Sequence, residues 1–378
     1  MKIKQTISAA WLVGSFTMTG MAVQADTEAV VDCPLRNAAY SIDLPLMEIL
    51  LKPEAVEVVN RNMDGIVDKM PSQFASKTAP SLSAILNLKS VAAMGGMPAQ
   101  VLEKVDAELR GLKVSDVDRR ARCARYDNEV PDFDLAKDKP SILVFHKING
   151  FDHGPSVSAA THAVQSLGEQ MGWNVAVTDK GGAFNPKTLA QFDAVIWNNN
   201  SGDVLTLSQR KAFENYVNNG GGYLGIHGAG GDFLYLWDWY ADTLLGARFI
   251  GHPMDPQFQD AAIHIEKNDA GIAHGLMPGW TMKGEWYSFR ESPRKSGAEV
   301  VATLDESSYQ PEGQGGQNLR MGDDHPIVWR RCIGKGRSFY TAIGHRPEAY
   351  HIPENLLLLR DALNWATGQS KAFCKTGK

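Results

Sequence analysis

The stretch from Gly220 to Asp232 constrains the fold of this chain more than any other part. It reads GGGYLGIHGAGGD, a buried apolar strand that breaks sharply into a glycine-rich turn at His227. An elbow of the G-x-S-x-G kind has this form, because small neighbours permit the bend that lifts one side chain above a sheet. Histidine there can exchange protons, bind a metal or donate to a substrate oxygen, but it is a poor nucleophile for acyl transfer. The alternative is a turn in which His227 only satisfies a backbone carbonyl.

The overall composition is that of a globular protein without a nucleic-acid footprint. The chain has 378 residues, of which 43% are hydrophobic and 21% charged, and a formal net charge of -5. No stripe of Lys and Arg with interleaved aromatic residues is present, so the sequence offers no basic surface for DNA or RNA. We therefore expect a small-molecule partner and no nucleic acid.

The N-terminus has the pattern of a secretory signal. Lys2 and Lys4 precede an apolar run from Ile7 to Val23, and Val-Gln-Ala then precedes Asp26. This order predicts a signal peptide over residues 1–25 and a periplasmic or secreted mature chain without membrane attachment. A membrane anchor is the alternative, but hydroxyl residues interrupt the apolar run and a small-residue cleavage site follows it.

The four cysteines are expected to form disulfides, since an exported chain folds in an oxidising compartment. Three pairings of four cysteines exist. Cys33 and Cys123 bracket the N-terminal segment, and Cys332 and Cys374 bracket the last strand and helix. We therefore favour these two local bridges.

The chain divides into a helical part and an α/β part. Apolar residues at helical spacing predict a small disulfide-stapled helical module over residues 33–126, followed by a polar linker at 127–140. Apolar strands alternate with amphipathic helices over residues 141–370, which predicts a parallel sheet with helices on both faces. The expected elements begin with strand Ser141–His146, helix Ala159–Met171, strands Trp173–Thr178 and Ala194–Trp197, helix Leu207–Asn218 and strand Gly222–Ile226. Strands Ala262–Ile265, Glu299–Leu304, Ile327–Trp329 and Arg337–Thr341 are expected to extend the sheet, and helix Pro353–Ala366 to close it.

Eight short motifs occur in order through the α/β part. They are Gly150–His153, Ser201–Leu205, Gly220–His227, Trp237–Tyr240, Gly251–Pro253, Glu285–Phe289, Asp324–Trp329 and Tyr340–His345. In these motifs the chain resembles the trehalose-utilisation, or ThuA-like, family over roughly residues 141 to 368. The resemblance implies a flavodoxin-like domain of the class I glutamine-amidotransferase type, with histidine at the nucleophile position. It also implies work on a disaccharide such as trehalose or its keto-sugar form, in a pathway that includes a sugar dehydrogenase.

The expected topology brings several titratable side chains to one edge of the sheet. Ligands of open parallel sheets bind outside the carboxyl ends of the strands. His153, Asp203, His227 and His345 each follow such a strand, and Glu285 is the carboxylate expected to join them. We predict His227, Glu285, His153 and His345 as catalytic residues, with the carboxylate orienting an imidazole or exchanging a proton.

The remaining predictions concern the substrate and a cofactor. We expect a sugar to contact Asp203, Asn200, Asp232, Trp239 and Tyr240. The aromatic residues could stack on a sugar ring or pack in the core. Three histidines and two carboxylates could also hold a divalent metal such as zinc, manganese or iron, although no H-x-x-x-H or H-E-x-x-H spacing is present. The sequence therefore leaves the cofactor open, and a non-catalytic sugar-binding module is the alternative to an enzyme.

Overall fold

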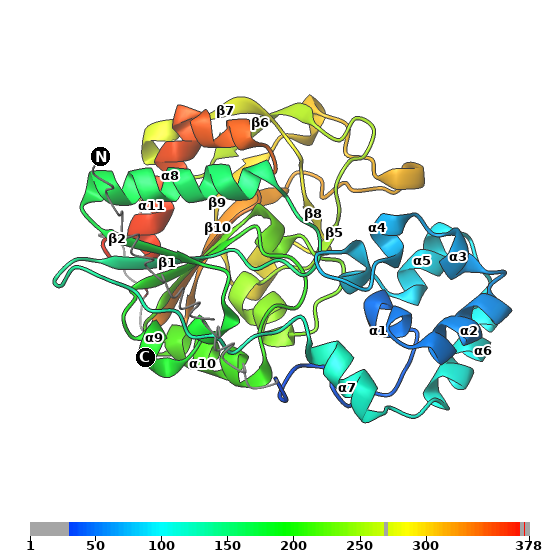
Figure 1. Cartoon of the computed structure of the whole chain (residues 1–378). Coiled ribbons are helices and arrows are strands. Elements are labelled where there is room, and N and C mark those ends of the chain that lie inside the picture. Colours follow the sequence, from blue (N-terminus) through cyan, green and yellow to red (C-terminus); the bar gives the residue numbers. More distant parts are fainter. Residues whose placement is uncertain (1–29, 268–270, 371–373, 375–378) are drawn as a thin grey trace, which may run out of the picture.

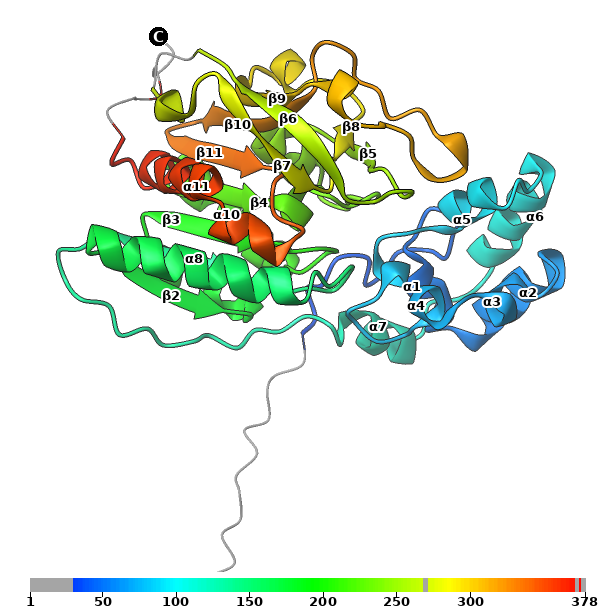
Figure 2. The same ribbon diagram turned by 90° about the horizontal axis from the view of Figure 1, so that it is seen from above.

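The computed structural model describes residues 30–267, 271–370 and 374, which form a helical module beside a larger α/β domain (Figure 1). The predicted signal peptide at residues 1–25 lies outside the described residues. Figure 2 shows that the parallel strands of the sheet run toward the module, so the carboxyl ends of these strands face it.

The helical module has a core of its own. Its helices are α1 (Leu46–Leu50), α2 (Pro53–Asn62), α3 (Ile66–Lys69), α4 (Ser72–Ala75), α5 (Leu88–Met94), α6 (Ala99–Arg110), α7 (Asp116–Cys123) and the 3-10 turn η1 (Leu82–Ala84). Val59 of α2 and Val105 of α6 are completely buried in one apolar cluster. Apolar residues at helical spacing account for this packing, since each short helix buries one face against its neighbours.

Five parallel strands form one half of a nine-stranded sheet. They are β1 (Ser141–Phe145), β2 (Asn174–Thr178), β3 (Ala194–Asn198), β4 (Gly222–Ile226) and β11 (Gly336–Thr341). Their order is β2-β1-β3-β4-β11, and every residue of β1, β3 and β4 is buried. Strands that are covered on both faces need mainly apolar residues, and the sequence supplies them except at Ser141 and Asn198, which lie at strand ends.

The other half of the sheet is antiparallel. It consists of β10 (Pro326–Ile333), β9 (Glu299–Leu304), β6 (Gln259–Ile265) and β7 (Gly279–Gly284), in that order beyond β11. Two residues, Gly334 and Lys335, join β10 to β11, and so short a connection permits only an antiparallel pair. Strand β6 alternates between buried and exposed residues, which is typical of a sheet that is solvated on one face.

Helices cover the parallel half on both faces, as predicted. Helices α8 (Pro155–Met171) and α11 (Pro353–Ala366) lie on one face, and α9 (Pro186–Leu189) and α10 (Leu207–Asn218) lie on the other (Figure 1). The predicted bounds of α10 and α11 match the structure. A small separate sheet pairs β5 (Phe249–Gly251) with β8 (Ser288–Phe289) near the module (Figure 2).

Both predicted disulfides are present. Cys33 pairs with Cys123, with 5.4 Å between their Cα atoms, and Cys332 pairs with Cys374 at 5.6 Å. The first closes the helical module, and the second ties β10 to the C-terminal segment. Two disulfides are consistent with a chain that folds outside the cytoplasm. Within the described ranges, no helix has the length and apolar character to cross a membrane.

Candidate functional site

His227 occupies a sharp strand-to-turn elbow, as the sequence predicts. Strand β4 ends at Ile226, and the 3-10 segment η3 (His227–Gly230) follows directly. The φ angle of His227 is +42°, a conformation that costs a residue with a side chain about 1–3 kcal/mol. Gly228 has no room for a side chain, because a Cβ atom there would lie 2.7 Å from the His153 ring. The turn after His227 therefore lies close against the ring of His153.

Three histidines converge above the carboxyl ends of the strands. His153 precedes α8, His227 follows β4 and His345 follows β11. Their ring centroids are 5.0 Å apart for His153 and His227, 4.9 Å for His153 and His345, and 5.3 Å for His227 and His345. One nitrogen from each ring lies within 4.8 Å of the other two. The predicted convergence of these side chains is thus present.

Glu285 lies at the centre of this group. It follows β7 and is 3% exposed. Its Oε2 atom accepts a hydrogen bond from Nδ1 of His345 at 2.9 Å and lies 3.2 Å from Nε2 of His227. Its Oε1 atom accepts from Nε2 of Gln257 at 2.5 Å and lies 3.3 Å from Nδ1 of His252. One buried carboxylate therefore contacts three imidazoles and an amide.

The electrostatics of the site favour a charged Glu285 carboxylate with neutral imidazoles at His153 and His227. Burial acts to raise the pKa of Glu285, but the interactions with His227, His345 and His252 outweigh it and hold the pKa well below its ordinary value. Burial lowers the pKa of His227, and burial together with the neighbouring histidines lowers that of His153 further. His153 and His227 are therefore neutral at neutral pH.

Two of the imidazole nitrogens in this cluster lack a hydrogen-bond partner. Nδ1 of His227 lies 2.6 Å from the carbonyl oxygen of Ala342 and must donate to it, so the neutral ring carries its lone pair on Nε2. Nε2 of His227 and Nδ1 of His153 are both buried and make no hydrogen bond. A bare lone pair that faces a carboxylate at 3.2 Å is unfavourable, so the contact with His227 lowers the pKa of Glu285 only when a proton or a cation lies between Nε2 and Oε2. The donor set therefore fits a divalent metal, whose histidine ligands commonly donate their other nitrogen to a carbonyl.

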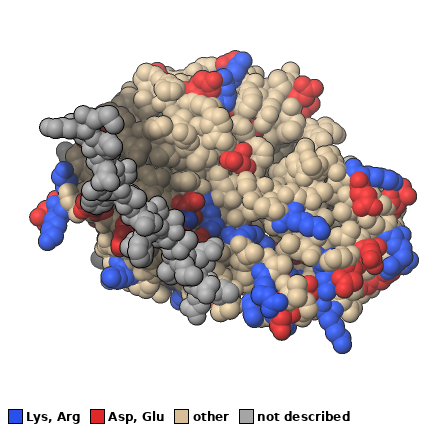
Figure 3. Space-filling view, viewed as in Figure 1, with Lys and Arg blue, Asp and Glu red and all other residues tan. Residues whose placement is uncertain are grey.

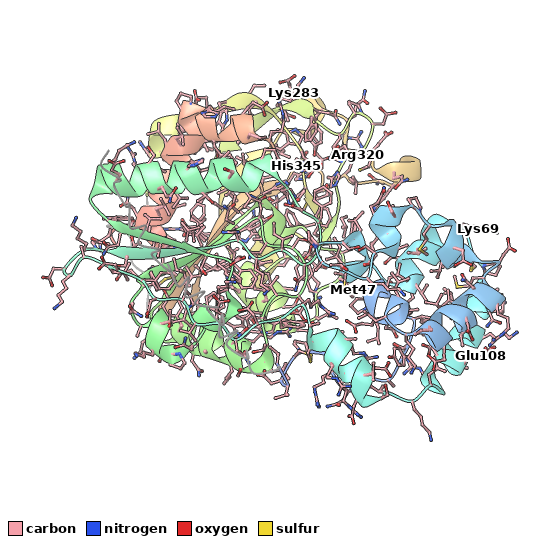
Figure 4. All side chains as sticks on the ribbon, in the orientation of Figure 1. Met47, Lys69, Glu108, Lys283, Arg320 and His345 are labelled. Atoms are coloured by element: carbon pink, nitrogen blue, oxygen red, sulfur yellow. A yellow bond between two sulfur atoms is a disulfide. The ribbon has the colours of Figure 1, made fainter. Side chains whose placement is uncertain are left out.

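A cavity of about 710 Å³ opens beside the cluster. His153, Glu285 and His345 line it, whereas His227 is fully buried behind them. Figure 4 labels His345 on the side of the α/β domain that faces the module, with Met47 across from it and Lys69 and Glu108 at the module's far end. Cavities of this size commonly hold small molecules.

The predicted sugar-binding residues lie elsewhere. Asp203, Asn200, Asp232 and Tyr240 line a separate cavity of about 30 Å³, too small for a sugar. Asp203 forms a buried ion pair with Arg210 and accepts from the Tyr126 hydroxyl at 3.0 Å. Asn200 donates to the carbonyl of Lys147 at 2.9 Å. The structure does not bring these polar residues to the histidines, because each already has a protein partner.

The two aromatic residues of this set pack against the core. The hydroxyl of Tyr240 donates to the Ala229 carbonyl at 2.6 Å and lies 2.8 Å from the Tyr223 hydroxyl. Trp239 is half-buried and stacks on Trp237, with 5.4 Å between ring centroids. Neither ring lines the cavity of the histidines. Of the two interpretations that the sequence left open, core packing describes their position.

Asp232 supports the site indirectly. Its carboxyl oxygens accept from the Ser201 hydroxyl at 2.5 Å and the Gly202 amide at 2.6 Å. The Ser201 hydroxyl in turn accepts from the amide of Phe151, whose ring lies 4.8 Å from that of His153. Burial raises the pKa of Asp232 to about 7. This residue therefore holds the loop that carries His153.

Two residues of the site were not predicted from the sequence. Gln257 donates to Glu285, and Tyr287 stacks on His227 with 4.2 Å between ring centroids. Gln257 lies in a loop after Pro256 and has no sequence signal. Tyr287 belongs to the Glu285–Phe289 motif, so its proximity to the carboxylate was the available signal.

The comparisons with known proteins identify the family of the α/β domain. The family model ThuA, described as trehalose utilisation, matches residues 141–366, which is more than half of the chain. The chain belongs to this family. The match contains the histidines and Glu285, whereas the helical module lies outside it.

Solved structures of ThuA-like proteins are similar to the α/β domain. One from Bacteroides uniformis is 25% identical, with a TM-score of 0.54, and the alignment covers 63% of this chain and 96% of that one. Another, from Parabacteroides merdae, is 19% identical, with a TM-score of 0.47 and coverage of 62% and 93%. The first likeness supports the fold, and the second is too distant to carry an argument. The comparison with curated proteins gave no match.

Proposed function

We propose that this chain is an extracytoplasmic enzyme that cleaves a disaccharide or its keto-sugar derivative. The observation that carries the proposal is Glu285, a buried ionised carboxylate in contact with the imidazoles of His227 and His345 at the wall of a cavity. Several titratable groups that converge on one cavity favour chemistry over simple binding. The description of the family, trehalose utilisation, supports a sugar substrate.

Acid-base chemistry can be assigned to residues of the cavity wall. A ketone acidifies the neighbouring C–H bond, and a base can then take that proton. The C–H electron pair forms a C=C bond, the glycosidic C–O bond breaks, and the base, now protonated, returns its proton to the leaving oxygen. Glu285 faces the cavity in its ionised form and is the base that we propose, while His345 hydrogen-bonds to it and orients it. His227, which has no access to the cavity, is a positioning residue.

A divalent metal is compatible with the same residues. His153, His227 and His345 would hold it, since zinc, manganese and iron all accept neutral imidazole. When bound, such an ion polarises a carbonyl oxygen and lowers the pKa of water. A keto-sugar substrate also implies a sugar dehydrogenase that supplies it.

The test is sugar release by the purified mature chain from trehalose and from 3-keto-trehalose, with and without a chelator. We expect release from the keto-sugar, and loss of this release on chelation if the histidines hold a metal. The His227→Ala variant should lose turnover as well, because Glu285 loses one of its contacts. Binding of both sugars without release would support the alternative, a non-catalytic sugar-binding module.

A further inference from the structure

The helical module supplies one wall of the cavity at the histidine cluster. Phe74, Leu82, Ile85, Leu86 and Ala93 of the module line the same space as His153, Glu285 and His345. These module residues lie outside the family match at residues 141–366. The wall is therefore a feature that this chain adds to the common domain.

The wall is held in a fixed place against the α/β domain. The Ser81 amide donates to the carbonyl of Asn149 in the α/β domain at 3.0 Å. Within the module, the Ser83 hydroxyl donates to the carbonyl of Ser76 at 2.7 Å. Ile85 lies directly on Gly150, where a Cβ atom would come within 2.6 Å of the isoleucine Cγ2. Gly150 begins the motif that carries His153, so the wall and the histidine loop are in contact. A wall fixed before binding needs little reordering when a ligand arrives.

The module side chains that form this wall are all apolar. The five module residues contribute no hydrogen-bonding side chain to the cavity. On the α/β side the apolar lining continues with Phe151, Phe233 and Met254, which are 39%, 46% and 49% exposed. Figure 3 shows Lys, Arg, Asp and Glu side chains gathered on the module at the right, and a largely uncharged surface over the middle of the same view. Large apolar side chains that stay exposed around one cavity indicate a binding surface.

The polar side chains that line the cavity all come from the α/β domain. They are His153, Ser201, His252, Gln257, Glu285, Gln314, Gln317 and His345. Hydroxyl groups placed against the module wall would lose their hydrogen bonds to water without replacement. An apolar group placed there would gain by burial. The cavity therefore suits a ligand that has one polar end with hydroxyl groups and one apolar end.

We propose that the module wall selects glycosides with an apolar, aromatic aglycone. The sugar ring lies at the Glu285 cluster, and the aglycone packs against Phe74 and Leu82 of the module. This inference rests on the proposed function, because it keeps the cleavage of a keto-glycoside at the Glu285 cluster, but it places an apolar group where a disaccharide has its second sugar ring. Phe74 and Leu82 are then specificity-determining residues that take no part in the bond cleavage.

The experiment compares the 3-keto derivatives of 4-nitrophenyl β-glucoside and methyl β-glucoside. We expect the wild type to prefer the aryl substrate in kcat/KM. Leu82→Ala should lower the ratio of kcat/KM for the aryl over the methyl substrate about tenfold, through KM of the aryl substrate. Leu102→Ala is the matched control, because Leu102 packs on the module core and is absent from the cavity wall. It should leave the ratio at the wild-type value.

The outcomes separate this inference from the proposed function. Equal kcat/KM for both substrates, or a ratio that Leu82→Ala does not change, overturns the inference and leaves the sugar chemistry intact. Turnover of 3-keto-trehalose without turnover of either glucoside also overturns the inference and leaves the proposed function intact. If the wild type turns over none of these three keto-sugars, the proposed function fails, and calorimetric binding of 4-nitrophenyl β-glucoside and methyl β-glucoside then tests the wall. Tighter binding of the aryl glycoside that weakens in Leu82→Ala supports the wall, and equal binding overturns it. Thermal melting confirms that both variants fold.

Discussion

The histidine cluster and the Asp203 pocket both lie at the carboxyl ends of parallel strands of one sheet, but they differ in the open space beside them and in the partners of their polar groups. Asp203 is buried against Arg210 and Tyr126 in a cavity of about 30 Å³. Glu285 is buried even more deeply, but it borders a cavity of about 710 Å³ and lies 3.2 Å from Nε2 of His227, which makes no hydrogen bond. Topology brings polar residues to an edge of the sheet, and only unsatisfied groups beside open space make that edge a candidate site.

The sharpest test of this comparison is Glu285→Gln. The amide is close in shape but cannot accept a proton, so we expect turnover of the keto-sugar to fall about 10²- to 10⁴-fold. The thermal unfolding temperature should change little, since the amide oxygen can still accept from His345. Steady-state kinetics and thermal melting on the same preparation check both statements. Turnover within threefold of the wild type would remove Glu285 from the chemistry.

Asp203→Asn should lower the folding free energy and leave turnover unchanged, the reverse of the result expected for Glu285→Gln. It leaves the buried Arg210 without its counter-charge, which costs about 3–5 kcal/mol of folding free energy for a buried pair. Turnover per folded molecule should stay at the wild-type level, because Asp203 does not line the histidine cavity. Urea unfolding measures the stability and active-site titration measures the folded fraction. A stable but inactive variant would show that the small pocket takes part in the reaction.

Asp232 should make the stability of the fold depend on pH. Its pKa is raised from 3.8 to about 7 by burial, so the folded chain holds a proton that the unfolded chain has released. Its contribution is fully present below pH 4 and is lost as pH rises through 7, by about 3–4 kcal/mol. Urea unfolding between pH 4 and 8 should therefore show a steeper decline for the wild type than for Asp232→Asn. Parallel curves would assign this pH dependence to other groups.

Metal binding should change the stability of the folded chain by less than the Asp203 and Asp232 substitutions do. A divalent ion held by the three histidines stabilises the folded chain by about 2.7 kcal/mol at a concentration 100 times its Kd. We expect zinc or manganese to raise the Tm of the wild type and not that of His153→Ala. His264→Ala is the matched control, because His264 lies exposed on β6. An equal rise of Tm in His153→Ala would place the ion elsewhere.

Local signals explain what the sequence could predict. The strand Gly222–Ile226, its elbow at His227 and the helix Leu207–Asn218 follow from runs of neighbouring residues, and the structure has them at the same positions. The histidine cluster follows from one further rule, that parallel strands end at the same edge of a sheet. The disulfides follow from the position of the cysteines around two compact segments.

Contacts between distant residues explain what the sequence could not predict. Nothing near Asp203 indicates that Arg210 and Tyr126 occupy both sides of its carboxylate. The predicted sugar contacts there arose from strand ends alone, which do not reveal whether a polar group is already satisfied. The apolar wall formed by Leu82 and Ile85 depends on how the helical module packs against the α/β domain. Neither the sequence of the module nor that of the α/β domain, taken alone, predicts this wall.

The measurement that tests the account most directly is turnover of 3-keto-trehalose by Glu285→Gln and Asp203→Asn side by side, each corrected for its folded fraction. The account predicts that Glu285→Gln loses turnover and keeps stability, while Asp203→Asn loses stability and keeps turnover. Equal loss of turnover in both, at equal folded fraction, would contradict the assignment of the chemistry to the histidine cluster.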